Sequence, residues 1–489
     1  MGLCRLGILC ICGELSGVSV RMNNLPVHVS RRSFLSFGAQ SAIGLALASL
    51  IRPYEAFAMP HVASKGWREE AAALVKSIRV PTFPKREVRV ALDPQAKEFD
   101  ARRAIQREID LLNRLGGGRV IVPAGRWYIK GPLRLTSNID LHLADGATLL
   151  FSDDPDDFLP AVVTRWEGTE MFGYSPFIYA YHAHNVAVTG SGTINGNRSS
   201  KTSGWRRKGS DQQRKLRSDG RNVAPVYERV FGEEGFLPPS LVQFFGCSSV
   251  LVEGISTADA LFWGIHILYS NDVTVRGVHA RSSHMTNDGV DIDSSYRVVV
   301  ERCTFNTGDD CIAIKSGRDA DGRLVGKPSE SIVIQNCVMD EGGGAGVALG
   351  SEMSGGIRNI FVTKCVMRDV ETVLDIKSNL DRGGMIENVR VWDLTVGTSE
   401  TVFGVTTVYH GYSGGSFAPR IRDIRLDGIA VKRSKRGIVI KGTPESPVED
   451  VVISSMVIDN VDVPQLVVHA KGLVVSGSSM NHQAVSVAS

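Results

Sequence analysis

The chain has 489 residues, of which 43% are hydrophobic and 22% charged, values typical of a folded soluble protein. Its 55 basic and 52 acidic side chains nearly balance, which argues against nucleic acid as the main partner, because phosphate binding normally leaves a basic patch. The 51 glycines, together with abundant Val, Ile, Asn and Asp, indicate many short strands joined by tight turns.

The N-terminal region has the pattern of an export signal. Residues 30–35 match the twin-arginine motif closely, an apolar run follows over residues 38–51, and residues 56–58 read Ala-Phe-Ala, a small-x-small cleavage pattern. The apolar run of about 14 residues is shorter than the roughly 20 that a membrane-spanning helix needs. We therefore expect export by the twin-arginine route to the periplasm or the exterior.

The boundaries follow from this signal. We expect residues 1–21 to be an extension upstream of a start at Met22, residues 22–58 to be the signal peptide, and residues 59–99 to be a linker and first segment. Residues 100–489 then form one catalytic domain.

One helix is predicted at the start of that domain, over residues 100–118. Asp100 is a suitable N-cap, and a Gly-Gly-Gly run ends the helix. Ile105, Ile109 and Leu112 share one face. We expect this helix to cap the open end of the fold that follows, and everything after it to be strands and turns.

That fold is predicted from a repeat. A polar turn residue followed by an apolar-x-apolar strand recurs from residue 185 to residue 453, at intervals of roughly 23–35 residues from Val250 onward. This interval suits one coil of a parallel β-helix, which needs three short strands and three turns, better than the longer four-stranded blades of a β-propeller. Five residues after each strand start, the sequence has only apolar residues or thiols: Ile255, Val278, Cys303, Cys337, Cys365, Leu394, Ile429 and Met456. We therefore predict an all-β, right-handed parallel β-helix with this column in its interior.

The cysteines do not indicate a disulfide framework or a zinc site. Five remain after the first dozen residues, an odd number, and none forms a Cys-x-x-Cys pair. Three of the five fall in the predicted interior column, where a thiol behaves as a small hydrophobic group.

Three carboxylates indicate the chemistry. Asp288 lies 21 and 22 residues before Asp309 and Asp310, about one coil, so the three side chains should lie on adjacent coils of one face. Glycoside hydrolysis needs two carboxyl groups in different protonation states, and crowding of like charges raises the pKa of one of them. Acidic residues often only satisfy turn backbones, and for Asp291, Asp293 and Asp319 we prefer that interpretation.

The stretch Asn306-Thr307-Gly308-Asp309-Asp310-Cys311, with Asn287-Asp288-Gly289 before it and Gly350-Ser351-Glu352 after it, resembles the signature of glycoside hydrolase family 28, the polygalacturonases. The resemblance implies that Asp309 is the general acid and that Asp288 and Asp310 hold and deprotonate the attacking water. It further implies single displacement with inversion, a carboxyl separation of roughly 6.5–9.5 Å, and no metal or organic cofactor.

Two positions depart from the family pattern. Gly344 stands where the family has the histidine of a Gly-His-Gly motif, and Asp375 stands where it has the arginine of Arg-Ile-Lys. Lys377, the lysine of that motif, remains. Because an acid replaces one of two cations, we expect weaker binding of a galacturonate at this subsite. Rhamnogalacturonan, branched pectin or a related glycan is the expected substrate, and weakened activity is the alternative.

Further substrate contacts are expected from residues around these motifs. Lys377 and Tyr409 match positions that contact substrate in the family, and Asn287 belongs to the Asn-Asp-Gly motif. His266 lies about one coil before Asp288 and either reaches the catalytic face or is a hydrogen-bonded histidine on the shoulder of the coil. Arg382 either restores the missing cation or is a solvated turn residue.

Two other classes remain open at this point. A pectate lyase shares the β-helix but needs calcium and a basic residue for proton abstraction, and no such arrangement is evident. A non-catalytic glycan-binding β-helix would bind without producing new reducing ends. We expect a monomer that acts on a polysaccharide and has no nucleic-acid or, after signal cleavage, membrane partner.

Overall fold

The computed structural model describes residues 19–22, 25–28, 66–91, 100–199, 201–202, 204–410 and 414–488. The expected twin-arginine motif, apolar run and cleavage site lie outside these residues. The chain divides into two units, Met1–Lys65 and Gly66–Ser489. In the first unit, β1 (Ser19–Met22) and β2 (Leu25–His28) pair as an antiparallel hairpin. No described helix combines the length and apolar character needed to cross a membrane.

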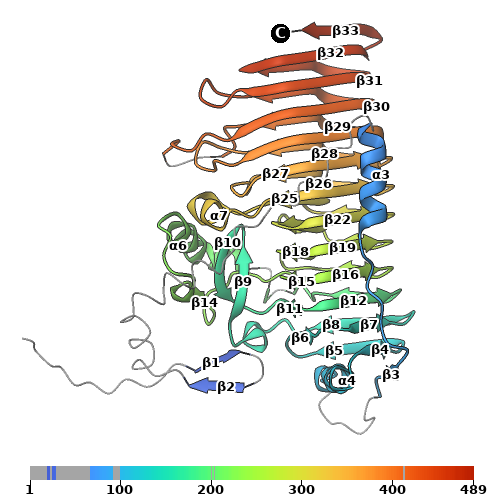
Figure 1. Ribbon diagram of the computed structural model, residues 1–489, viewed down its shortest axis with the longest axis vertical. Coiled ribbons are helices and arrows are strands. Elements are labelled where there is room, and N and C mark those ends of the chain that lie inside the picture. The colour runs from blue at the N-terminus through green and yellow to red at the C-terminus, as the bar shows by residue number, and fades with distance from the viewer. Residues whose placement is uncertain are drawn as a thin grey trace, which may run out of the picture. The chain divides into compact units, whose positions relative to one another are not determined.

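The second unit is the predicted right-handed parallel β-helix, with three sheets along its axis (Figure 1). The first sheet contains β3 (Glu87–Arg89), β4 (Gly118–Val122), β7 (Ile139–Leu143), β12 (His184–Gly190), β16 (Ser248–Glu253), β19 (Asn271–Arg276), β22 (Tyr296–Glu301), β25 (Ser329–Gln335) and β27 (Ile357–Thr363). The second contains β5 (Gly125–Ile129), β8 (Ala147–Phe151), β13 (Thr193–Asn195), β17 (Ser256–Ala258), β20 (His279–Arg281) and β23 (Thr304–Thr307). The third contains β6 (Leu133–Leu135), β11 (Ile178–Tyr181), β15 (Val242–Phe245), β18 (Ile265–Leu268), β21 (Val290–Asp293) and β24 (Ile312–Lys315).

Later coils have longer strands that continue around the corners from one sheet into the next. These are β26 (Val338–Gly350), β28 (Val366–Lys377), β29 (Met385–Thr406), β30 (Arg420–Lys441) and β31 (Val448–Val468). The last coil continues into β32 (Ala470–Met480), against which β33 (Gln483–Ala488) turns back antiparallel.

The interior is built from one residue in two along each strand, because neighbouring side chains of a strand point to opposite faces. The predicted column is confirmed as interior: each member is at most 2% exposed, from Ile255 and Val278 at 0% to Leu394 at 2%. Cys303, Cys337 and Cys365 are buried and unpaired within it. These thiols therefore pack as small hydrophobic groups.

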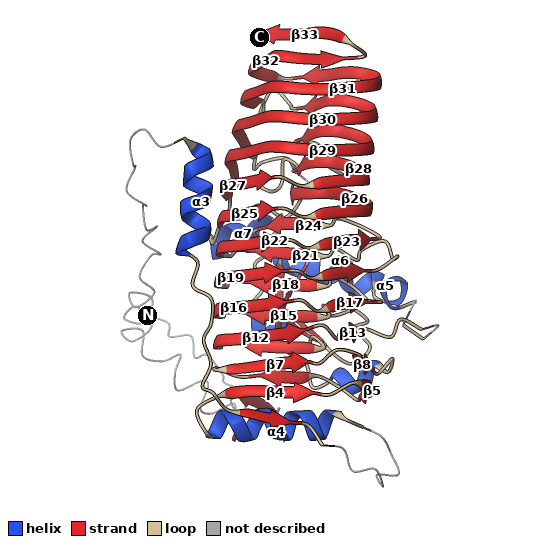
Figure 2. Cartoon of the chain, turned by 90° about the vertical axis from the view of Figure 1, so that its right-hand side faces the viewer, coloured by secondary structure: helices blue, strands red, loops and turns tan. Residues whose placement is uncertain are grey.

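The capping helix is also confirmed. It is α4 (Arg102–Arg114), and Ile105, Ile109 and Leu112 are buried against the first coils. The Asp100 carboxylate accepts the Arg102 N–H at 3.0 Å, although the residue in the cap position is Ala101. Figure 2 shows α4 lying across the end of the β-helix.

The stretch expected as a linker contains a second helix, α3 (Trp67–Ser77), which runs along the outside of the first sheet (Figure 2). Its buried face packs on outward-pointing side chains of four successive coils: Val299, Val333, Phe361 and Trp392. Val299, Val333 and Phe361 each stand between two apolar core residues, so the sequence does not distinguish them from the core residues beside them.

The expectation of strands and turns alone after α4 was wrong. Two inserted segments, one between β8 and β11 and one between β13 and β15, together form the insertion. It contains a small sheet of β9 (Val162–Trp166), β10 (Thr169–Gly173) and β14 (Val230–Phe231) beside α5 (Trp205–Lys208) and α6 (Ser210–Arg221), while α7 (Asp319–Val325) follows β24. One short 3₁₀ helix, Pro155–Phe158, precedes β9, and another, Val226–Glu228, lies between α6 and β14. The helix α6 buries only Leu216 and Gly220, so its sequence lacks the apolar periodicity that reveals a helix.

Candidate active site

Strand alternation puts charged side chains on the outer face of the third sheet. Val290 and Ile292 of β21 point into the core, so Asp291 and Asp293 point outward. Parallel register then places Lys315 of β24 beside Asp293. Lys377 of β28 lies two coils after Lys315, beside Gly350 of β26. A cationic row thus forms next to the outward aspartates.

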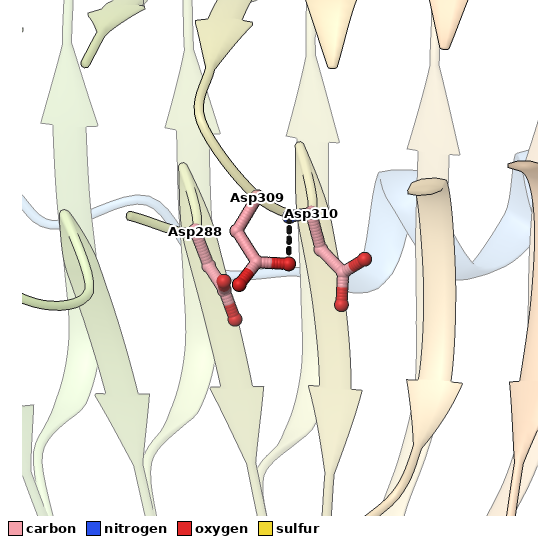
Figure 3. A group of neighbouring side chains, drawn as sticks. All are labelled: Asp288, Asp309 and Asp310. Atoms are coloured by element: carbon pink, nitrogen blue, oxygen red, sulfur yellow. Dashed lines mark hydrogen bonds between the residues drawn. The ribbon is translucent and has the colours of Figure 1, made fainter. Parts of the chain in front are cut away.

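Asp288, Asp309 and Asp310 come together as predicted, at the corner where the chain enters this sheet (Figure 3). Carboxylate oxygens from all three lie within 4.8 Å of one another. The Asp310 N–H donates to Asp309 Oδ1 at 3.0 Å, which fixes the relative orientation of the neighbouring carboxylates. These oxygens are closer than the 6.5–9.5 Å expected for inversion, so the spacing alone does not favour inversion over retention.

The pKa values of the three carboxyl groups differ. Burial and the Asp310 charge raise the pKa of Asp309. Burial also acts to raise the pKa of Asp310, but Lys377 and Lys315 outweigh it and hold that pKa below its usual range. Burial raises the pKa of Asp288 to about 7, against the opposing effect of Lys315. Asp309 is therefore suited to donate a proton, and Asp310 to remain ionised.

Asp310 is the most firmly held of the three. Its Oδ2 accepts from Lys377 Nζ at 2.9 Å, and its Oδ1 accepts from the Ala345 N–H at 2.8 Å. Lys315 Nζ lies 3.4 Å from Asp288 Oδ2 and 3.7 Å from Glu352 Oε2. The three aspartates have a spacing that could also hold a metal ion, but these two ammonium groups already supply the positive charge that an ion would bring.

Gly344 lies directly against the catalytic corner. A Cβ built on it would lie 2.7 Å from Asp310 Oδ1 and 2.8 Å from Asp309 Oδ1. No side chain, and so no imidazole, fits there on this backbone. Glycine at this position, where the family has histidine, therefore allows the backbone to approach the carboxylates of Asp309 and Asp310 closely.

Asp375 changes the surroundings of Lys377. Its Oδ2 lies 3.8 Å from Lys377 Nζ, and burial raises the pKa of Asp375 to about 6, against the opposing effect of Lys377. The Tyr409 ring centroid lies 5.7 Å from the same ammonium group. Lys377 thus faces two carboxyl groups, Asp310 and Asp375, before any substrate arrives.

Two of the predicted substrate contacts, Asn287 and Arg382, are buried and form hydrogen bonds within the protein. Asn287 donates to Ala260 O and Phe262 O, both at 2.8 Å, and its Oδ1 accepts from the His284 N–H at 3.2 Å. Arg382 donates to Ser351 O at 2.8 Å and to the Asp319 carboxylate. These side chains hold the turns that carry site residues.

His266 is fully buried, and its Nδ1 lies 2.8 Å from Gln243 Nε2. Its Nε2 lies 3.6 Å from Asp293 Oδ2, while Asp293 also accepts from Arg165 at 2.9 Å. Burial lowers the pKa of His266 despite the contribution of Asp293. The ring nitrogens of His266 therefore face Gln243 and Asp293 inside the protein.

Lys315 and Asp291 are the site residues that the sequence interpretation missed. Asp291 is 0% exposed, and its Oδ1 lies 3.5 Å from Lys315 Nζ, the cation that Asp288 also faces. The alternation of Ile312 and Ile314 could have placed Lys315 outward, on the face of the aspartates. Assigning Asp291 to a turn overlooked that it lies inside a strand.

The insertion adjoins the site on the Lys315 side. Arg318 donates to Glu167 O at 3.0 Å and to the Glu352 carboxylate, so the hairpin of β9 and β10 is tied to the end of β26. An apolar cluster that includes Trp166, Leu216 and Trp263 packs the insertion together. Trp263 also lies 4.9 Å from Lys315 Nζ.

A groove of about 630 Å³ crosses successive coils from Ser282 to Lys435, next to the corner that carries Asp309. Its charged lining consists of Glu341, Asp369, Glu371, Glu400, Arg433 and Lys435. Lys435 pairs with Glu400 at 2.6 Å. The charged groups that remain are the three carboxylates of Glu341, Asp369 and Glu371 and the guanidinium of Arg433. The groove therefore repels a polyanion more than it attracts one.

Comparisons with known proteins find relatives along most of the β-helix. The family model described as Glycosyl hydrolases family 28 matches residues 159–467. A probable polygalacturonase of Vitis vinifera is 26% identical over 70% of this chain and 67% of its own. An exo-poly-alpha-D-galacturonosidase of Dickeya chrysanthemi is 27% identical over 58% of this chain and 50% of its own.

Solved structures give the same picture. A hyperthermoactive exopolygalacturonase from Thermotoga maritima superimposes with a TM-score of 0.82 at 33% identity, over 87% of this chain and 99% of that one. The polygalacturonase of Erwinia carotovora shares the fold, with a TM-score of 0.60 at 21% identity over 83% of this chain and 98% of that one.

Proposed function

Because the chain belongs to glycosyl hydrolases family 28 and is therefore a glycosidase, we propose that it cuts a pectin-type polysaccharide next to a sugar that carries no carboxylate. Rhamnogalacturonan and branched pectins contain such sugars. The observation that carries the proposal is the Asp375 carboxylate, 3.8 Å from the Lys377 ammonium group. The acidic groove beside the site supports it, since a polyuronate would meet uncompensated negative charge there.

The catalytic roles follow from the protonation states. Asp309 gives its proton to the leaving glycosidic oxygen, because burial and the Asp310 charge raise its pKa and favour its protonated form. Asp288 and Asp310 orient a water molecule, and one of them takes a proton as the water oxygen bonds to the anomeric carbon. We propose single displacement with inversion, since Asp310 already accepts from Lys377 and Ala345 and is better placed to orient water than to attack. The anomer released first, followed by NMR, tests this directly.

The substrate proposal is tested with matched variants at one position. Asp375→Arg restores the second cation and should raise kcat/KM on unbranched polygalacturonate by about tenfold or more, because a charge-assisted carboxylate contact contributes about 1.5–3 kcal/mol. Asp375→Asn removes the anion without adding a cation and should give a smaller gain. The proposal is wrong if the wild type cuts unbranched polygalacturonate as efficiently as rhamnogalacturonan.

We also propose that the chain is exported through the twin-arginine route and acts as a monomer. The motif at residues 30–35 supports export. Replacement of Arg31 and Arg32 by Lys should retain a fused reporter in the cytoplasm, and export of that variant at the wild-type level would contradict the proposal. Sedimentation of the mature protein at a dimer mass would exclude the monomer.

A further inference from the structure

Asp291 is a buried carboxyl group in an unusual position. It is 0% exposed, and neither of its oxygens accepts a hydrogen bond from any N–H or O–H group of the described residues. Lys315 Nζ lies 3.5 Å from Asp291 Oδ1, long for a hydrogen bond. Asp288 Oδ2 lies 3.4 Å from the same ammonium group, so the two carboxyl groups are neighbours across Lys315. An ionised carboxylate can only accept a hydrogen bond. A hydrogen bond between Asp288 and Asp291 therefore forms only when one of the two carries a proton.

The charges at Lys315 lead to the same conclusion. This one ammonium group faces Asp288, Asp291 and Glu352 at 3.4, 3.5 and 3.7 Å. Glu352 also accepts from Arg318, so its charge is balanced. One positive charge remains for the Asp288–Asp291 pair, and a second buried anion without a donor would be costly. The pair therefore holds one proton.

Depth decides which carboxyl group holds it. Asp288 is 4% exposed and faces Asp309 and Asp310, whereas Asp291 is 0% exposed on the strand beyond. Ionisation costs more at the deeper position, and burial and the Asp288 charge raise the pKa of Asp291 well above its usual range.

We infer that Asp291 is a positioning residue that keeps its proton and donates a hydrogen bond to Asp288, so that Asp288 stays ionised and turned toward the attacking water. This inference rests on the proposed role of Asp288 in hydrolysis. The charged and titratable groups that face the pair are Lys315 on β24, Asp309 and Asp310 at the corner before it, Glu352 after β26, and His266 on β18.

The test compares Asp291→Asn with Asp291→Ala across pH. Asn keeps an N–H donor toward Asp288 and an oxygen toward Lys315, so the acid limb of the kcat/KM profile should stay in place. Ala removes the donor to the charged form of Asp288, so that limb should move up by about one pH unit, with recovery of kcat/KM at higher pH.

Other results would overturn the inference. If Asp291 were ionised, Asp291→Asn would remove a negative charge and move the acid limb to lower pH. If Asp291 only filled space, Asp291→Asn, which has nearly the same shape, would keep wild-type activity, and Asp291→Ala would lose activity equally at every pH with no shift of the acid limb.

A second readout does not depend on turnover. The infrared spectrum of the resting wild type above neutral pH should contain the C=O band of a protonated, buried carboxyl group that Asp291→Asn lacks, and no difference in that band would refute the inference. If the wild type cleaves no glycan, the proposed function fails while this band still reports on Asp291. If Asp291→Ala does not fold, Asp291→Asn and the infrared band remain sufficient.

Discussion

The substitution Asp375→Asn should stabilise the protein, and the gain should depend on pH. The pKa of Asp375 is raised from 3.8 to about 6, so the folded state binds this proton more tightly than the unfolded state does. Stability from this group is therefore fully present below about pH 4 and is lost as pH rises to about 6. At 1.36 kcal/mol per pKa unit the loss is about 3 kcal/mol, an upper value because the side chain is 24% exposed.

Urea denaturation at about pH 4 and about pH 8 measures this difference. Asp375→Asn should match the wild type at the lower pH and exceed it by up to about 3 kcal/mol at the higher pH. Asp459→Asn is the control, since Asp459 is exposed on β31, away from Asp375, and the substitution is the same. Equal differences at both pH values, or a less stable Asp375→Asn at the higher pH, would refute the reasoning.

Three further variants test the surroundings of the aspartates. Lys377→Met leaves the buried Asp310 carboxylate without its cation, so urea denaturation should show a loss of about 3–5 kcal/mol and initial rates a loss of about 100-fold in kcat/KM. A loss below about tenfold would contradict that role. Asn287→Ala removes the hydrogen bonds that hold the turn before Asp288 and should lower the free energy of unfolding by about 2–4 kcal/mol, whereas an unchanged urea midpoint would contradict it. Gly344→Ala places a methyl group 2.7 Å from Asp310 Oδ1, so steady-state kinetics should show a lower kcat, and wild-type kcat would mean that the backbone there yields.

Much of the fold could be predicted from the sequence because a β-helix repeats. Each coil places equivalent residues in one column, so a few apolar positions such as Ile255 and Met456 identify the interior of many coils at once. The helix α3 could not be predicted in this way. Its contacts are with outward-facing residues such as Val333 and Phe361, whose burial depends on the helix being there.

The candidate site was predictable to the extent that it depends on coil spacing. Asp288, Asp309 and Asp310 are about one coil apart and meet at one corner. Direction within a turn is not encoded in that spacing, which is why Asn287 and Arg382 were expected to face substrate but instead bind backbone carbonyls. The position of Asp291 follows from strand alternation, yet its lack of a donor appears only in three dimensions.

The most direct test of the account is release of reducing ends by the mature protein and by Asp309→Asn on polygalacturonate, rhamnogalacturonan and branched pectins. We predict that the wild type releases reducing ends fastest from a polymer with sugars that lack a carboxylate. The substitution should abolish release from every polymer, because the amide cannot protonate the leaving oxygen. Release by Asp309→Asn at the wild-type rate would contradict the assignment of Asp309 as the general acid and the catalytic role of this corner.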